Sequence, residues 1–376
     1  GLDRLRQFVP RAGAAYARTR NHDPSPDAAA GVSRLSPWLR RRLLTEEEVL
    51  AAVLHRHSLA AAEKFVQEVV WRSYWKGWLE LRPAVWTDYR AGLARALDRV
   101  ATEAGLRRGW EVACHGETGI EGFDAWAREL AETGYLHNHA RMWFASIWIF
   151  TLRLPWELGA DFFLRHLLDG DPASNTLSWR WVAGLQTRGK TYLARPDNIA
   201  KYTGGRFRPA GLATQAPPLE GPEPPPPGPA PASDPVDPAR PTGLLLTEED
   251  LAPGPVFASG IAPRATAFLD CSGGLSPLAV APHVTAHVRG AMEDAARRWT
   301  HRLGRVSRLE SAAQIGDWAA REGLEQVVTP WAPIGPAADA LHGLPVRRVL
   351  RDWDAACWPH ATHGFFRFRK HIPELI

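Results

Sequence analysis

Three groups of polar and aromatic residues in the first half of the chain could support chemistry. The first group is Phe65, Glu68, Trp71 and Arg72, at positions i, i+3, i+6 and i+7. This spacing places all of them on one face of a helix. A carboxylate, a guanidinium and two aromatic rings on one stripe would make a poor hydrophobic core. Taken alone, however, the pattern is typical of a half-buried amphipathic helix with a local Glu–Arg pair.

The second group is Asn138, Arg141 and Met142, which also share one helix face. The third is the stretch DGDPASNTLSWRW, residues 169–181, in which two acids flank a glycine and two tryptophans follow. An Asp-rich loop could hold a cation, but the ligands here are too few, so no metal site is predicted. The same acids could instead cap a helix that begins near Pro172.

The elements that must position these groups are helices. Residues 44–59 begin with Thr45 followed by glutamates, which is typical of a capped helix N-terminus. Apolar residues recur at helical spacing in 60–79, 123–133, 137–152 and 156–168. We therefore predict a helical domain over residues 1–210.

A Pro-rich run, residues 216–242, divides the chain. It cannot pack a core and favours extended polyproline II, so we predict a linker over 211–242. Strand-like runs then alternate with helix-like segments, which indicates an α/β domain with a parallel sheet over 243–376. The strand-like runs are 266–269, 324–328 and 346–350, and the helix-like segments include 283–303 and 314–322. The predicted fold is mainly α, with a small α/β domain after the linker.

The composition, 45% hydrophobic and 23% charged over 376 residues, is that of a globular protein. No apolar run is long enough to span a membrane and no signal-peptide pattern is visible, so no membrane partner is expected. The three scattered cysteines fit reduced thiols. We expect a cytoplasmic monomer. A net charge of +4 permits a nucleic-acid partner without requiring one.

Taken together, these motifs resemble the flavin-binding helical domain of the DNA photolyase and cryptochrome family, over about residues 10–210. The most specific match is to the family's DGD, Asn and W-x-W pattern, here Asp169, Gly170, Asp171, Asn175, Trp179 and Trp181. The stretch VSRLS at 32–36, with Tyr16 upstream, resembles the phosphate-contact motif. The family's TGxxxxDA is matched by Thr118, Gly119, Asp124 and Ala125.

The resemblance implies FAD as the cofactor, folded into a U inside a helical bowl. Ser33 and Ser36 would donate to its pyrophosphate, and Asp171 would accept the flavin N3–H. Asp169 would pair with Arg141 beside the flavin, and Asn175 would face flavin N5. The full set of implied FAD contacts is Tyr16, Ser33, Arg34, Leu35, Ser36, Phe65, Glu68, Arg72, Asn138, Arg141, Asp169, Gly170, Asp171 and Asn175.

The resemblance also implies a substrate, UV-damaged DNA with a flipped cyclobutane pyrimidine dimer. The implied catalytic residues are Glu68, Trp71, Met142, Asn175 and Trp181. Glu68 would hydrogen-bond the dimer while Trp71 and Trp181 supply stacking or edge walls. Related (6-4) enzymes carry histidines at the Asn138 and Met142 positions, so this sequence argues for the cyclobutane dimer.

For electron transfer, Trp179 resembles the flavin-proximal tryptophan of the family and Trp156 the middle one. No tryptophan stands at the outer place near Glu103, where Trp110 or Trp148 could substitute. DNA contacts are expected from Arg72, His139, Arg188, Lys190 and Arg195. Ala194 stands where the family has an arginine. The run Arg40, Arg41 and Arg42 is either a phosphate contact or a solvated helix end.

Photolyases of this family begin with an α/β antenna domain, whereas here an α/β segment follows the helical domain. Residues 319–341 and 364–376 resemble pieces of that antenna domain, which suggests a permuted order. An unrelated stabilising domain is the alternative, and no second chromophore is identified. The implied function is blue-light-driven repair of cyclobutane dimers. The alternatives are a cryptochrome-like photoreceptor without repair and a flavin-binding relic active only on single-stranded DNA.

Overall fold

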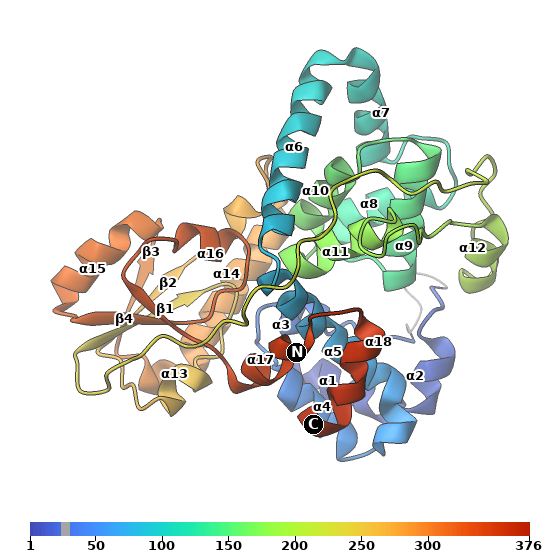
Figure 1. The fold of residues 1–376 in the computed structure, drawn as a ribbon. Coiled ribbons are helices and arrows are strands. Elements are labelled where there is room, and N and C mark those ends of the chain that lie inside the picture. The colour runs from blue at the N-terminus through green and yellow to red at the C-terminus, as the bar shows by residue number, and fades with distance from the viewer. Residues whose placement is uncertain (24–30) are drawn as a thin grey trace.

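The computed structural model describes residues 1–23 and 31–376, and in it a helical part precedes a parallel five-stranded α/β part (Figure 1). Both parts agree with the predicted fold class. The helices of the first part are α1 (Leu2–Phe8), α2 (Ala14–Thr19), α3 (Ser36–Arg40), α4 (Glu46–Leu54), α5 (Leu59–Glu80), α6 (Ala84–Thr102), α7 (Ala104–His115), α8 (Phe123–Thr133), α9 (Asn138–Ser146), α10 (Trp156–His166), α11 (Pro172–Val182) and α12 (Pro196–Tyr202). Across the described ranges, no helix is both long and apolar enough to cross a membrane. Nor do those ranges contain three or more His, Cys, Asp or Glu side chains arranged to hold a metal ion.

Local signals in the sequence account for several helix ends. Thr45 and Glu48 form a reciprocal capping box at the start of α4, with side chain to backbone distances of 3.2 and 2.7 Å. The loop before α8 is closed by Asp124, whose carboxylate accepts from the Thr118 hydroxyl at 2.6 Å. Helix α9 continues into a π-helical turn, Ile147–Thr151. The apolar patterns did not predict α6 and α7, which form a hairpin that projects from the molecule (Figure 1).

The sheet has the order β3-β2-β1-β4-β5, with every pair of neighbouring strands parallel. Its strands are β1 (Thr242–Thr247), β2 (Ala265–Leu269), β3 (Arg305–Leu309), β4 (Gln326–Pro330) and β5 (Val346–Val349). Helices α13 (Gly254–Ala258) and α14 (Pro282–Arg298) pack on one face, and α15 (Ile315–Glu322) and α16 (Pro336–Ala340) on the other. The sequence patterns missed β1, which follows directly on the Pro-rich run, and β3, a largely exposed edge strand without an apolar run.

The last part of the chain departs from the expected domain boundary. Residues 243–376 were expected to form one α/β domain, but the segment after β5 returns to the helical part. This C-terminal segment contains α17 (Asp352–Cys357), α18 (Phe365–Phe368) and α19 (Ile372–Leu375), and its buried side chains belong to the helical core. A Cβ atom on Gly77 of α5 would lie 2.9 Å from the Trp358 Cα, so a glycine is needed where the segment crosses α5.

The Pro-rich stretch contains no helix or strand over residues 213–237 and runs along the surface (Figure 1). It is tied to both parts of the molecule by backbone hydrogen bonds. Gly228 N–H donates to the Leu81 carbonyl at 2.8 Å, and Asp234 N–H donates to the Arg348 carbonyl at 2.9 Å. The linker therefore follows a fixed path along both parts.

Candidate functional site

The predicted pair between Arg141 and Asp169 is present. Arg141 Nη2 lies 3.0 and 2.9 Å from the two Asp169 carboxylate oxygens, and its Nε donates to the Leu136 carbonyl at 2.9 Å. Arg141 comes from α9, and Asp169 from the turn that joins α10 to α11. The pair is only partly buried, so the guanidinium is fixed in place and remains accessible.

Two further guanidinium groups lie near this pair. Arg34 has a left-handed backbone with φ of 52° and lies 4.7 Å from the Tyr135 ring centroid. Burial raises the pKa of Tyr135 to about 12 against the opposing charges of Arg141 and Arg34. Arg20, at the end of α2, forms an ion pair with Glu68 of α5. The result is a cluster of cations from three separate segments.

Tyr16 of α2 lies beside the ion pair between Arg20 and Glu68. Burial raises the pKa of the Glu68 carboxyl, although Arg20 opposes the shift. Burial, followed by the Glu68 charge, raises the pKa of the Tyr16 hydroxyl. Tyr16 also packs edge-on against Phe65 at 5.2 Å, so Phe65 belongs to the apolar floor beneath the cluster. The carboxyl of Glu68 can therefore keep its proton at a higher pH than usual.

Helix α11 forms the other side of the region. Asn175 Nδ2 donates to the Ala160 carbonyl at 2.8 Å. On the same helix, Thr176 Oγ1 and Trp179 Nε1 are buried and have no hydrogen-bond partner within the described residues. These two atoms lie inside the helical core, where the Trp179 ring packs edge-on against Trp148 and Phe163.

A family model described as the FAD binding domain of DNA photolyase matches residues 65–205. Residues 65–205 of the helical part are thus similar to the FAD-binding domain of the photolyase and cryptochrome family. A deoxyribodipyrimidine photo-lyase of Streptomyces griseus is 34% identical over 212 residues, covering 52% of this chain and 45% of that protein. The Thermus thermophilus photo-lyase is 37% identical over 161 residues, covering 41% of this chain and 36% of its own length.

Among solved structures, a bacterial class III photolyase from Agrobacterium tumefaciens is 28% identical, with a TM-score of 0.44. The similarity covers 54% of this chain and 42% of that one. The chain thus spans less than half the length of the curated relatives and of the solved structure named here.

The residues of this region fit FAD. The cations Arg20, Arg34 and Arg141 suit a cofactor that is negatively charged at its pyrophosphate and, when reduced, at its flavin. Ser33 and Ser36 flank the buried Leu35 at the start of α3, and Ser33 Oγ already accepts from the Leu35 N–H at 3.3 Å.

Three implied FAD contacts have other partners. Asp171 caps α11 by accepting from the Ser174 N–H at 2.8 Å, and its other oxygen lies 2.8 Å from Lys76 Nζ. These contacts favour the capping alternative, and the expected role as acceptor of flavin N3–H stays a prediction. A Cβ on Gly170 would lie 2.9 Å from the Leu164 carbonyl oxygen, so this glycine serves close packing.

Arg72, expected at both FAD and DNA, has partners within the protein. Its Nε lies 3.1 Å from Glu46 Oε1, and its Nη2 donates to the Arg40 carbonyl at 3.2 Å. With its guanidinium held inside the protein, Arg72 joins α5 to the start of α4.

Both interpretations of the run Arg40–Arg42 are wrong, because all three side chains are buried. Arg40 forms a bidentate ion pair with Glu249, in which Nη1 lies 2.6 Å from Oε2. The Nε of Arg40 donates to the Gly170 carbonyl at 2.8 Å. Burial alone would raise the pKa of Glu249, but Arg40 and Lys76 overcome it and lower that pKa. The run therefore contacts another part of the same chain.

That part is the acidic run that follows β1, residues 248–250. Arg42 lies 2.9 Å from Asp250 and 2.7 Å from Asp354 of the C-terminal segment. Arg41 has only a 3.5 Å contact to the Glu248 carbonyl, and burial together with Arg40 lowers its pKa to about 10. The carboxyl end of the central strand, where open α/β sheets usually bind ligands, is occupied by these arginines.

The substrate-side residues are only partly gathered. Trp71 is half-buried, and its ring stacks on Phe365 of the C-terminal segment with centroids 3.6 Å apart. Trp181 stacks with Tyr192 at 5.9 Å. Met142 is half-buried on α9, and Asn138, the first residue of that helix, is exposed. Trp71 therefore has one ring face covered, which no pattern in the sequence indicates.

Of the expected DNA contacts, His139 is turned inward. It stacks on Trp143 at 4.1 Å, and its Nδ1 lies 3.0 Å from the Asn21 carbonyl oxygen. Arg188, Lys190 and Arg195 are exposed, although Arg188 pairs with Glu223 at 2.8 Å. His139 is thus corrected from a surface contact to part of an aromatic cluster.

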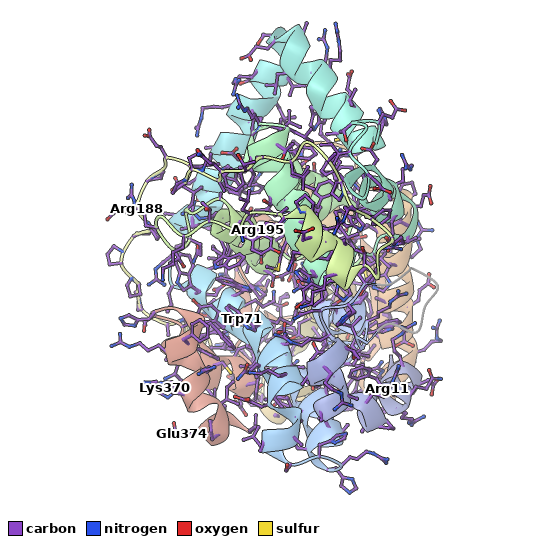
Figure 2. All side chains as sticks on the ribbon, turned by 90° about the vertical axis from the view of Figure 1, so that its right-hand side faces the viewer. Arg11, Trp71, Arg188, Arg195, Lys370 and Glu374 are labelled. Carbon is purple, nitrogen blue, oxygen red and sulfur yellow. The ribbon has the colours of Figure 1, made fainter. Side chains whose placement is uncertain are left out.

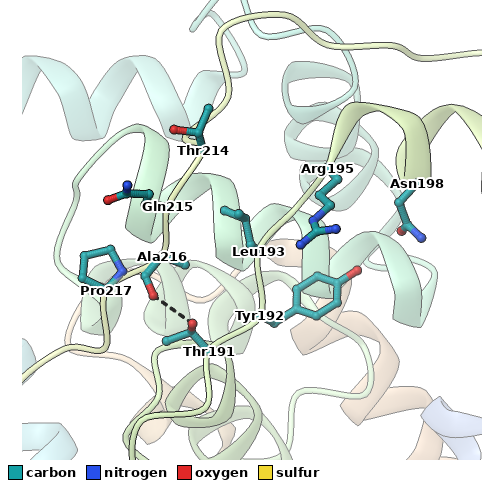
Figure 3. A pocket seen from close by; sticks show the side chains of 9 residues that line it. All are labelled: Thr191, Tyr192, Leu193, Arg195, Asn198, Thr214, Gln215, Ala216 and Pro217. Atoms are coloured by element: carbon teal, nitrogen blue, oxygen red, sulfur yellow. Dashed lines mark hydrogen bonds between the residues drawn. The ribbon is translucent and has the colours of Figure 1, made fainter.

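Arg195 lies at a surface cavity of about 740 Å³ next to Tyr192 (Figure 3). Arg195 and Asn198 lie on one side of it and Thr214 and Gln215 on the other (Figure 3). The cavity is closed at one end by a hydrogen bond of 2.8 Å from Thr191 Oγ1 to the Ala216 carbonyl. It places a cation beside the ring that stacks on Trp181.

The aromatic surroundings of Trp179 favour Trp148 as its neighbour. Trp179 contacts Trp148 edge-on at 6.2 Å, and Trp148 Nε1 donates to the Pro155 carbonyl at 2.9 Å. Trp156 packs against Tyr89 at 5.6 Å and lines a surface cavity of about 790 Å³. The expected order of Trp179 and then Trp156 stays a prediction.

Sequence reasoning missed Arg20, Lys76 and Phe365. A signal existed for Arg20, which lies one helical turn after Tyr16 and so shares its face. None existed for Lys76, whose partners Asp171 and Glu249 come from distant parts of the chain.

Proposed function

We propose that this chain is a flavin-dependent enzyme that uses blue light to repair cyclobutane pyrimidine dimers in DNA. The match of residues 65–205 to the photolyase FAD-binding domain carries the proposal. The relatives named deoxyribodipyrimidine photo-lyase support the same reaction, and the convergence of Glu68, Arg141 and Asp169 supplies a site for it.

Reduced FAD, when bound, would supply an electron to the lesion under blue light and take it back after the ring splits. Arg141, fixed by Asp169, would hold a positive charge at that site and favour an anionic reduced flavin. Glu68, whose pKa is raised by burial, would share its proton with a carbonyl of the flipped dimer. Arg20 would hold the Glu68 carboxyl in position.

A second candidate, a blue-light photoreceptor without repair, is favoured by one observation. Phe365 covers a ring face of Trp71 that a repair enzyme would turn toward the lesion. The flavin site would serve both functions, so only an assay of repair separates them.

We also propose that the α/β part is antenna-like in permuted order. Its parallel sheet and its place after the helical part support this order. The buried arginines at the carboxyl end of β1 give no support to a second chromophore there, so none is proposed.

The test is a repair assay with the full chain. Flavin absorbance of the purified protein is recorded first, and the pre-reduced protein is then mixed with an oligonucleotide carrying one thymine dimer. Blue light is expected to restore thymines that a dark control does not. The variant Arg141→Gln is expected to lose roughly 10- to 100-fold in the light-dependent rate. Arg107→Gln, which removes an exposed arginine on the projecting hairpin, is the matched control and keeps the rate.

Each other outcome has a clear meaning. Bound, photoreducible flavin without any restored thymine would contradict repair and support the photoreceptor candidate. Equal rates for Arg141→Gln and Arg107→Gln would contradict the role given to Arg141.

A further inference from the structure

The C-terminal segment presents two different faces around α18. One face is apolar and holds the segment on α5. Phe365 stacks on Trp71, Phe368 lies 5.4 Å from the Tyr74 ring, and Tyr74 Oη donates to the His363 carbonyl at 2.8 Å. The segment is therefore fixed beside Trp71.

The other face of the segment is basic and carries one exposed ring. Phe366 is 74% exposed, more than any other large hydrophobic residue of the described chain. Arg369 lies 5.2 Å from its ring centroid, and Arg367 and Lys370 are exposed beside it. Within the described residues, none of these three cations forms an ion pair. An exposed aromatic ring among unpaired cations is the composition that binds unstacked nucleic acid.

The position of this basic face near Trp71 also suits nucleic-acid binding. In the view of Figure 2, Trp71 lies between Lys370 on one side and Arg195 on the other. Phe366 directly follows Phe365, which stacks on Trp71, so the backbone of Phe366 lies near the Trp71 site while its own ring faces solvent. A DNA strand that reaches Trp71 would have cations next to it along this segment.

We propose that residues 364–371 form a contact site for single-stranded or unstacked DNA at the border of the Trp71 site. Arg367, Arg369 and Lys370 bind phosphates, and Phe366 stacks on one base. The choice of DNA as the ligand rests on the proposed function, while the site itself lies outside the matched residues 65–205. Stacking on Phe366 requires an unpaired base, so the site favours a single strand over a duplex.

The test is a binding titration in the dark, with a fluorescein-labelled single-stranded oligonucleotide followed by anisotropy at several salt concentrations. The triple variant Arg367→Gln, Arg369→Gln, Lys370→Gln is expected to bind more weakly. Its negative slope of log affinity against log salt should become shallower by about 2. Each of the three lost phosphate contacts on a single strand contributes about 0.7 to that slope. The variant Phe366→Ala is expected to lose roughly 5-fold or more in affinity at an unchanged slope.

A matched control removes three exposed arginines on the projecting hairpin, Arg95, Arg107 and Arg108. This control changes the net charge by the same amount and is expected to keep the slope. Unchanged binding by the triple variant would overturn the proposal and show that these cations serve another partner, such as an acidic protein. An equal loss in the triple variant and the control would also overturn it, since net charge alone would then explain binding.

This outcome is separate from that of the repair assay. Salt-dependent binding lost in the triple variant, with no repair by the unchanged protein, would support the contact site and contradict the proposed function. Repair by the unchanged protein with equal DNA binding by the triple variant would do the reverse.

Discussion

Two basic runs of similar composition have opposite surroundings in this molecule. Arg40–Arg42 are buried, and Arg40 and Arg42 have carboxylate partners that come from the strand part or the C-terminal segment. Residues 367–370 are just as basic, but their cations are exposed and unpaired within the described residues. One run joins parts of the chain, and the other faces solvent.

The difference shows that a charge run takes its role from where carboxylates are placed by the fold. Glu249 and Asp250 follow the central strand β1, and their carboxylates pair with Arg40 and Arg42 of the helical part. The second run has only Glu374 nearby in sequence, and that residue lies 3.5 Å from His371. Breaking the buried run should therefore alter stability, whereas changing the exposed run should alter binding.

The largest effect is expected from Arg42→Ala. Arg42 lies at φ of 50°, a strained conformation that its ion pairs with Asp250 and Asp354 hold in place. Its removal leaves buried carboxylates without compensation, which typically costs about 3–5 kcal/mol. Denaturant unfolding of the purified variant measures this loss. A change below about 1 kcal/mol, which is a roughly fivefold change in the unfolding equilibrium, would contradict a joining role for the run.

The second-largest effect on stability is expected from Glu80. This carboxylate also lies between the helical part and the α/β part, but it forms no ion pair in the described chain. It accepts from Trp331 Nε1 at 3.2 Å and from the Ile334 N–H, and burial raises its pKa to about 7. Because the folded state holds this proton more tightly, stability is greatest below about pH 4.5 and falls as pH rises toward 7. The full loss, once pH has risen above 7, is about 3 kcal/mol.

Glu80→Gln keeps an oxygen acceptor and removes the titration. Unfolding curves at pH 5 and pH 8 should differ less for this variant than for the unchanged protein. An identical pH dependence in both proteins would show that Glu80 is not the group that titrates.

Much of the helical part could be predicted, because its signals are local. The capping box of Thr45 and Glu48 lies within one helical turn, and the pair of Arg141 and Asp169 followed from the family resemblance. The partner of Arg40 could not be predicted, because Glu249 is 209 residues away and only the fold brings it near. For the same reason, the sequence placed residues 352–376 with the adjacent sheet rather than on α5.

The site was recognised by residue types, but its side-chain partners depend on packing. Asp171 matches the family motif and could have faced a flavin. The buried Lys76, on another helix, takes one of its oxygens instead, and no spacing rule links these two positions. Likewise, the C-terminal Phe365 covers Trp71 only because Gly77 lets the segment approach α5 closely.

A smaller effect on stability is expected from Arg41→Leu, because Arg41 differs in its contacts from the other two arginines of the buried run. Arg41 is as buried as Arg40 but has no ion pair with a carboxylate in the described residues. Burial and the charge of Glu249 raise the pKa of Glu248 to about 7, so that carboxyl can take up a proton when Arg41 is removed. Stability should change by less than about 1.5 kcal/mol in either direction. Denaturant unfolding beside Arg42→Ala checks this, and a loss as large as that of Arg42→Ala would mean that burial rather than pairing sets the cost.

The smallest effect on stability is expected from neutralising the exposed run with Arg367→Gln, Arg369→Gln and Lys370→Gln together. These side chains lie on the solvent face of the C-terminal segment, and the apolar face that anchors it, with Phe365 and Phe368, is unchanged. Surface substitutions of this kind usually stay within about 0.5 kcal/mol each. A thermal melt of the triple variant should overlay that of the unchanged protein while DNA affinity falls. A lowered melting temperature would instead show that the exposed cations also hold the segment on α5, and the contrast between the two basic runs would be one of degree.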